Sequence, residues 1–172
     1  CKNMQLFMKF FNRISKLNVF LQSFLAGILS ALAFAPFDLF FPLVISISWF
    51  YYLFNKSLHF SWKKIFLLGL SYGVGYFFAG VYWISISLLV DIGQFWWLLP
   101  FSITLFPLVL GLFIAFTSVS SYFVFKKFKL QEYQKVLVFA LFWLVFELVR
   151  GYIFTGLPWN LAGYAMMFSD YA

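Results

Sequence analysis

Two opposite charges, Glu147 and Arg150, lie three positions apart inside an apolar stretch near the carboxyl end of the chain. Residues three positions apart share one face of a helix. Ionisable side chains within a membrane span are costly, and they usually face the interior of a helix bundle and partner each other. We therefore expect a structural ion pair between Glu147 and Arg150. A guanidinium also matches a phosphate through two parallel hydrogen bonds.

The segment directly after this pair combines a helix-ending proline with aromatic side chains. Its marked residues are Thr155, Gly156, Pro158, Trp159 and Tyr164. Proline ends a helix, and tryptophan is enriched where lipid meets water. A span that carries buried charge and ends in an aromatic turn is a candidate functional site. The alternative is an ordinary structural ion pair near a helix end, with Trp159 as an interfacial anchor.

The composition identifies the kind of protein that must position these residues. The 172 residues are 65% hydrophobic and 10% charged, with a mean hydropathy of +0.95. A small soluble domain buries only about 60–70% of the surface that its unfolded chain exposes, so it could not hide this much apolar surface. We expect an all-α, polytopic transmembrane helix bundle. Cys1 is the single cysteine, which rules out an intrachain disulfide and a thiol metal cluster, and we expect no metal or cofactor.

Apolar runs divide the chain into about five expected spans, and the bundle as a whole should cover residues 19–155. The expected spans are 19–35, 39–54, 65–90, 98–125 and 136–154. Residues 1–18 should form a basic, amphipathic amino terminus, because Lys9, Arg13 and Lys16 recur at helical spacing; a plain positively charged flank is the alternative. Residues 156–172 should form a loop on the outer side that is truncated.

Small residues and prolines indicate how the central spans pack. Gly69 and Gly73 are spaced to let two helices approach closely in lipid. Pro107 lies inside the fourth span and should kink it. The first span resembles a secretory signal peptide, but Pro36 would follow the cleavage site and obstruct a peptidase. We therefore expect a retained helix.

The basic residues predict the orientation. The net charge of +7 does not indicate nucleic-acid binding, because the lysines lie at the ends of apolar runs and not in one patch. With the amino terminus in the cytoplasm, eleven of the twelve basic residues fall on the inner side. Arg150 is the exception, toward the outer side. An outward-facing site for an anionic lipid headgroup would account for it.

Three blocks of sequence together resemble bacterial apolipoprotein N-acyltransferase, along nearly the whole chain. They are Leu32-Ala33-Phe34-Ala35-Pro36-Phe37-Asp38; Gly69, Gly73, Gly75, Gly80, Trp83, Ser85 and Ser87; and Glu147, Arg150, Gly151, Thr155, Gly156, Pro158, Trp159, Gly163 and Tyr164. The third block is the most specific. The order and spacing fit the amino-terminal membrane domain of that family.

The resemblance implies a bacterial inner-membrane protein with a cytoplasmic amino terminus. Members of the family move an acyl chain from a phospholipid to the amine of the diacylglyceryl-cysteine that begins an apolipoprotein. Their chemistry belongs to a nitrilase-like domain with a Glu–Lys–Cys triad, which follows later spans and is absent from this chain. We therefore expect no catalytic residue here and a chain that is inactive alone, with the missing carboxyl-terminal catalytic part as a partner. Arg150, Thr155, Gly156, Pro158, Trp159 and Tyr164 are the expected substrate-binding residues.

Two other classes of function remain open. A small transporter or substrate-binding membrane subunit could use a buried charge pair to line a path, and it would bind its ligand without a soluble domain. For a purely structural membrane partner, neither Arg150 nor Trp159 would matter.

Overall fold

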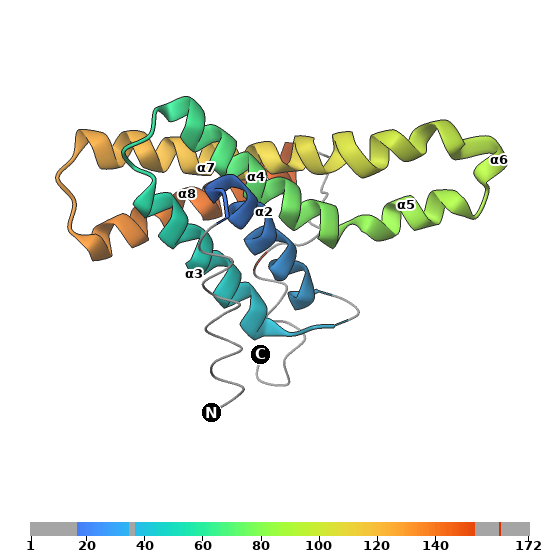
Figure 1. The fold of residues 1–172 in the computed structure, drawn as a ribbon, viewed down its shortest axis with the longest axis horizontal. Coiled ribbons are helices and arrows are strands. Elements are labelled where there is room, and N and C mark those ends of the chain that lie inside the picture. The colour runs from blue at the N-terminus through green and yellow to red at the C-terminus, as the bar shows by residue number, and fades with distance from the viewer. Residues whose placement is uncertain (1–16, 35–36, 154–161, 163–172) are drawn as a thin grey trace.

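The computed structural model describes residues 17–34, 37–153 and 162. Within these ranges every regular element is a helix (Figure 1), which confirms the expected all-α class. In chain order the elements are α2 (Val19–Ser30), the 3-10 turn η1 (Ala31–Ala33), α3 (Phe40–Lys56), α4 (Trp62–Gly80), α5 (Tyr82–Leu89), α6 (Ile92–Phe95), the 3-10 turn η2 (Trp96–Leu98), the π-helical segment η3 (Phe101–Leu105), α7 (Phe106–Lys127) and α8 (Glu132–Ile153). The basic amino terminus expected over residues 1–18 lies almost wholly outside the described residues.

α2 begins after a capping residue, and the backbone after η1 turns back into α3. Asn18 caps α2, because its side-chain oxygen accepts a hydrogen bond from the backbone N–H of Phe20 at 2.9 Å. Asp38 has a φ of 50°, a left-handed conformation that aspartate tolerates better than most residues do. The N–H of Leu39 then donates to the carbonyl of Leu32 at 3.0 Å, so α3 turns back beside α2.

The third and fourth expected spans are not single straight helices. The third is interrupted at Val81, which has φ −118° and ψ 14° and separates α4 from α5. In the fourth, Pro107 occupies the first turn of α7 and follows the π-helical segment η3. Pro107 has no amide hydrogen to donate to the carbonyl of Ile103, so an α-helical register cannot continue unbroken through this point. The helix type therefore changes just before Pro107, and the kink expected at this residue stays a prediction.

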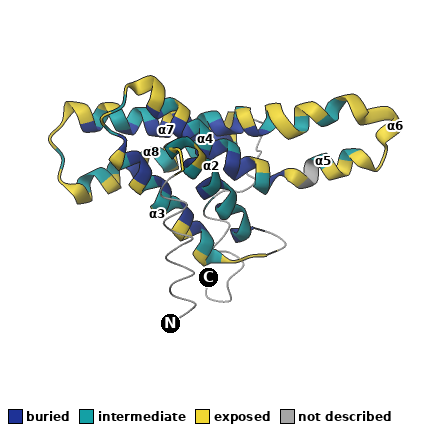
Figure 2. Cartoon of the chain, in the orientation of Figure 1, coloured by how far each residue is buried: buried dark blue, intermediate teal, exposed yellow. Residues whose placement is uncertain are grey.

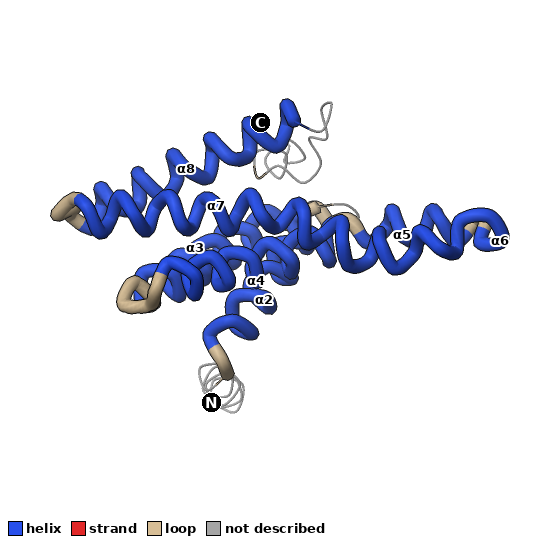
Figure 3. The backbone as a smooth tube through the Cα atoms, turned by 90° about the horizontal axis from the view of Figure 1, so that it is seen from above, coloured by secondary structure: helices blue, strands red, loops and turns tan. Residues whose placement is uncertain are grey.

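Glycines join α2, α4 and α7 into a closely packed core (Figures 1 and 3). A Cβ on Gly27 would collide with the backbone of Tyr72, and one on Gly75 would collide with the backbone of Phe24. A Cβ on Gly73 would lie 2.6 Å from the Cα of Gly111 on α7. The small residues of α4 therefore bring it into backbone contact with α2 on one side and with α7 on the other. The close approach that the spacing of Gly69 and Gly73 predicted is present.

Buried hydroxyl groups connect the same helices. Ser23 on α2 donates to the carbonyl of Leu68 on α4 at 2.9 Å. Ser46 on α3 donates to the carbonyl of Ala26 on α2, and its oxygen lies 2.8 Å from the hydroxyl of Tyr72 on α4. These bonds satisfy polar groups that lipid could not satisfy.

The loop between α3 and α4 and the loop between α7 and α8 lie at one end of the bundle (Figures 1 and 3). Tyr122 donates to the carbonyl of Phe60 at 3.1 Å, and the Asn55 side chain donates to Glu132 at 3.4 Å. We call this the basic end, because Lys56, Lys63, Lys64, Lys126 and Lys127 lie here, each 5.4–6.0 Å from an aromatic ring. Lysine with aromatic residues is typical of a membrane interface.

Among the described residues, two helices are long and apolar enough to cross a membrane, Phe101–Lys127 and Glu132–Ile153. Val19–Ala33 is apolar but shorter. The five-span division and its orientation remain predictions, although a helix or a pair of helices lies at each expected span.

Candidate functional site

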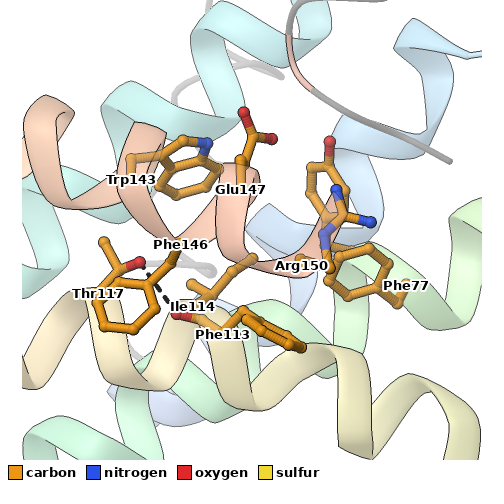
Figure 4. A pocket seen from close by; sticks show the side chains of 9 residues that line it. Phe77, Phe113, Ile114, Thr117, Trp143, Phe146, Glu147 and Arg150 are labelled. Carbon is orange, nitrogen blue, oxygen red and sulfur yellow. Dashed lines mark hydrogen bonds between the residues drawn. The ribbon is translucent and has the colours of Figure 1, made fainter. Parts of the chain in front are cut away.

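Glu147 and Arg150 lie near the carboxyl end of α8, where this helix crosses α4 and α7. As their spacing predicted, both side chains line one small cavity (Figure 4). Its other lining residues are Tyr76 and Phe77 from α4, Phe113, Ile114 and Thr117 from α7, and Trp143 and Phe146 from α8. The cavity volume of about 10 Å³ is close to the minimum for one water molecule. It is too small for a lipid headgroup.

Arg150 is buried, with 2% of its surface exposed. Its guanidinium lies over the ring of Phe77, with the Cζ atom 5.0 Å from the ring centroid (Figure 4). A cation in this position is attracted by the ring quadrupole, and the attraction is stronger when the pair is desolvated. Arg150 thus fixes the end of α8 against α4, and its charge is held beneath the protein surface.

Glu147 connects α8 to the segment that follows it. The backbone N–H of Ala162 donates to Oε1 of Glu147 at 2.9 Å. A carboxylate that accepts a backbone hydrogen bond forms a strong, charge-assisted contact. Glu147 and Arg150 also interact electrostatically across the cavity, and a direct ion pair between them stays a prediction.

Five of the expected substrate-binding residues lie outside the described residues: Thr155, Gly156, Pro158, Trp159 and Tyr164. Ala162, between Trp159 and Tyr164 in the chain, is described. Because Ala162 bonds to Glu147, the polypeptide returns to α8 within this predicted segment. Arg150 is the one expected substrate-binding residue that the structure describes.

A second, larger groove runs between α3 and α8. Its volume is about 490 Å³, and its lining is Ile47, Ser48 and Tyr51 from α3, Val136, Phe139, Ala140, Trp143, Leu144 and Glu147 from α8, and Ala162. The Tyr51 hydroxyl and the Trp143 indole nitrogen are buried and make no hydrogen bond. The indole nitrogen lies on the side of its ring that faces Glu147 (Figure 4). The groove is therefore mainly apolar and has polar atoms beside Glu147.

Sequence reasoning did not identify Trp143 or Phe77 as part of the site. Trp143 precedes Glu147 by four residues, so helical spacing alone would have placed it on the same face. Phe77 gave no such signal, since the chain contains 28 phenylalanines. Among the described residues, no three His, Cys, Asp or Glu side chains gather where they could hold a metal ion.

Comparison with known proteins gives one consistent result. Residues 26–171 match the family described as the apolipoprotein N-acyltransferase N-terminal domain. An apolipoprotein N-acyltransferase of Rickettsia bellii is 43% identical over 146 residues, which are 85% of this chain and 28% of that protein. Proteins of the same name are 42% identical over 147 residues in Rickettsia typhi and 34% identical over 154 residues in Brucella melitensis, and each match covers 86% of this chain.

The chain thus spans little more than a quarter of the length of the curated relatives it matches. Together with the helical structure and its two long apolar helices, the match identifies a membrane protein. The chain belongs to the apolipoprotein N-acyltransferase family, to the part that forms the amino-terminal domain.

Proposed function

We propose that this chain forms the membrane part of an enzyme that transfers an acyl chain from a phospholipid to the amino-terminal amine of an apolipoprotein. The family match over residues 26–171 supports this function. We assign the acyl-transfer step to a part of the enzyme outside this domain, in line with the resemblance, which places the Glu–Lys–Cys triad in a nitrilase-like domain. By itself the chain would be inactive.

The contribution of this domain would be to position the substrates. Holding two reactants in a productive arrangement can supply several kcal/mol of a reaction barrier. The observation that carries the proposal is the hydrogen bond from Ala162 to Glu147, because it holds Ala162, which lies between Trp159 and Tyr164 in the chain, against α8. The predicted Thr155–Tyr164 segment would then border the opening through which lipid and apolipoprotein reach the active site.

The groove between α3 and α8 would be this lateral opening. Its walls are mainly apolar, and it reaches Glu147 and Ala162, so an acyl chain could lie in it beside the predicted segment. Arg150 is almost fully buried. We therefore propose that Arg150 acts by holding α8 and its following segment in place, with direct headgroup contact left to Trp159 and its neighbours.

The proposed location is the bacterial inner membrane, crossed several times, with the amino terminus in the cytoplasm. The lysines of the basic end would then face the cytoplasm, in accord with the excess of basic residues on that side of membrane proteins. The Glu147–Ala162 contact lies toward the other end of α8 and would face outward, where an apolipoprotein substrate is presented.

A hybrid enzyme tests the proposal. Residues 26–171 would replace the matching part of the Rickettsia bellii relative, and acyl transfer from phospholipid to a diacylglyceryl-cysteine peptide would be measured in membranes. Arg150→Ala, Trp159→Ala and the groove-filling Ala140→Trp should each reduce transfer. Leu67→Ala is the control, because Leu67 is exposed on α4 and lines neither the cavity nor the groove.

Normal transfer by both Arg150→Ala and Trp159→Ala, at normal protein abundance, would reject the positioning role. Normal transfer by Ala140→Trp alone would reject the groove as the lipid path and leave the predicted segment in place. Acyl transfer by the 172-residue chain alone would show that the chemistry lies within it.

A further inference from the structure

We propose that the tip of the hairpin between α5 and α7, residues 91–98, lies in the outer lipid interface and anchors this hairpin to the membrane surface by its tryptophans. The tip comprises α6, η2 and the residue before them, Asp91. It is distinct from the site near Glu147 and from the groove beside α8. The binding partner proposed for the tip is the lipid surface of the membrane.

The length of the hairpin places its tip beyond the rest of the bundle. Residues 62–89, which form α4 and α5, rise about 42 Å at about 1.5 Å per residue, whereas α8 rises about 33 Å. Both start at the basic end, and Figures 1 and 3 show α5 and α6 projecting past the other helices. The hydrocarbon core of a bilayer is about 30 Å thick. The tip therefore reaches the opposite interface even if α4 and α5 tilt.

The surface of the tip is apolar and aromatic. Trp96 is 65% exposed, Trp97 53% and Ile92 53%, and Val90 just before the tip is 89% exposed; Figure 2 shows this end of the hairpin almost wholly exposed. Tryptophan is enriched at the level of the lipid headgroups, where one part of its ring system is in contact with lipid and its N–H with water. In water these side chains would form an unfavourable exposed patch.

The charge pattern indicates that the tip contacts lipid through its aromatic rings and not through charged side chains. Asp91 is the single charged residue between Lys64 and Lys126. The tip thus has no cation that could attract anionic headgroups, in contrast to the basic end with its five lysines over aromatic rings. Its contact with the membrane should therefore depend little on salt.

Both legs of the hairpin change helix geometry at the same level. Val81, directly after α4, and Pro107, in the first turn of α7, line one cavity of about 250 Å³. Ser85 and Ser102 line the same cavity, and their hydroxyl groups, 2.9 Å apart, link the two legs. An added Cβ on Gly93 in the tip would meet no atom within 4 Å, and Trp96 and Trp97 are exposed, so contact with lipid would stabilise the position of the tip.

A depth measurement on the purified chain in phospholipid vesicles tests this anchor, because no other protein is present to cover the tip. In a Cys1→Ser background, a nitroxide label would be attached at Ile92→Cys in the tip, at Ser61→Cys in the basic end, or at Leu141→Cys midway along α8. Collision rates with oxygen and with a water-soluble nickel chelate give the depth of each label. The Ile92 label should lie between the other two, protected from nickel relative to Ser61 but less deep than Leu141.

The tryptophans should carry this protection. Trp96→Ala combined with Trp97→Ala should make the Ile92 label accessible to nickel, and the label at Leu141 should stay at its depth, which shows that the bundle is intact. Phe123→Ala combined with Leu137→Ala is the matched control, since both side chains are exposed elsewhere, and it should leave the Ile92 label protected.

A measurement at high salt shows whether the tip contacts the membrane through aromatic side chains or through charge. The depth of the Ile92 label should be unchanged at about 1 M salt, where the screening length falls to about 3 Å. An Ile92 label as accessible to nickel as the Ser61 label would overturn the anchor, and so would one as deep as Leu141. Protection that survives the double tryptophan replacement, or that is lost in salt, would assign the contact to other residues and reject the proposal.

Discussion

The helices α7 and α8 are of equal length but join the bundle in different ways. Of the most apolar stretch of each, 39% is buried in α7 and 11% in α8. Glycines bring α7 into backbone contact with α4, through Gly73 and Gly111. In α8, Phe139 packs on Phe50 with ring centroids 6.0 Å apart, and the contact is made by large side chains.

These two kinds of packing suit two different roles within one domain. Backbone contact through glycine leaves no space for adjustment, so the core of α2, α4 and α7 has one well-defined arrangement. Aromatic side chains hold α8 at a greater distance, and the space between them contains the cavity at Glu147 and the groove beside Tyr51. The rigid core thus supports a helix around which a substrate path can form.

The largest expected effect comes from adding one methyl group in the core. Gly75→Ala would place a Cβ against the backbone of Phe24, and backbone cannot move aside as a side chain can. Overpacking of this kind costs about 1–3 kcal/mol and occasionally more. Unfolding of the chain in detergent, followed by circular dichroism, should show the loss.

Gly151→Ala is the matched change in α8, where a new Cβ meets nothing within 4 Å. It should be neutral or stabilising, by up to about 1 kcal/mol from helix propensity. Equal destabilisation by the two replacements would mean that α8 is packed as closely as the core, and the contrast between the core and α8 would be lost.

The glycine packing shows how far the sequence predicts this fold. Spacing predicted that Gly69 and Gly73 allow close approach, and apolar runs predicted the helices. The partner helix could not be predicted, because a glycine pattern shows where a backbone can approach but not which backbone does. Nor could the break at Val81 be predicted, because no proline marks it in the sequence.

For the candidate site, the sequence predicted the positions of Glu147 and Arg150 but not the residues that they contact. The position of Glu147 and Arg150 on one face follows from helical period, and a buried charge in an apolar run indicates a specific partner. The partners themselves, the amide of Ala162 and the ring of Phe77, come from elsewhere in the chain. A backbone amide has no sequence signature, and a phenylalanine is uninformative in this composition.

A smaller and more local effect is expected at Glu147. Glu147→Ala removes the acceptor for the Ala162 amide, which is only partly buried, so the cost should be near that of a typical hydrogen bond, about 1 kcal/mol. Because Ala162 lies outside the helices, this cost should open the segment after α8 without unfolding the core. Hydrogen exchange at the Ala162 amide should become faster, whereas exchange in α4 should be unchanged.

Glu147→Gln is the control for this prediction, since an amide side chain keeps an oxygen that can accept the same hydrogen bond. It should retain most of the protection at Ala162. If Glu147→Ala also left exchange at Ala162 unchanged, Glu147 would not hold the segment, and the positioning role proposed for α8 would lose its main support.

The smallest effect is expected on the outward face of α8. Leu141 is 57% exposed, whereas Leu68 in α4 is fully buried. Lipid tails are as apolar as leucine, so Leu141→Ala in vesicles should change the free energy of unfolding by less than about 0.5 kcal/mol, as at most exposed positions. Leu68→Ala is the buried reference and should cost clearly more than Leu141→Ala, because it leaves a cavity in a packed core. If Leu141→Ala lowered the free energy of unfolding as much as Leu68→Ala, protein would cover this face of α8. In that case α8 would pack as closely as α7, and the two helices would differ only in the partner that they contact.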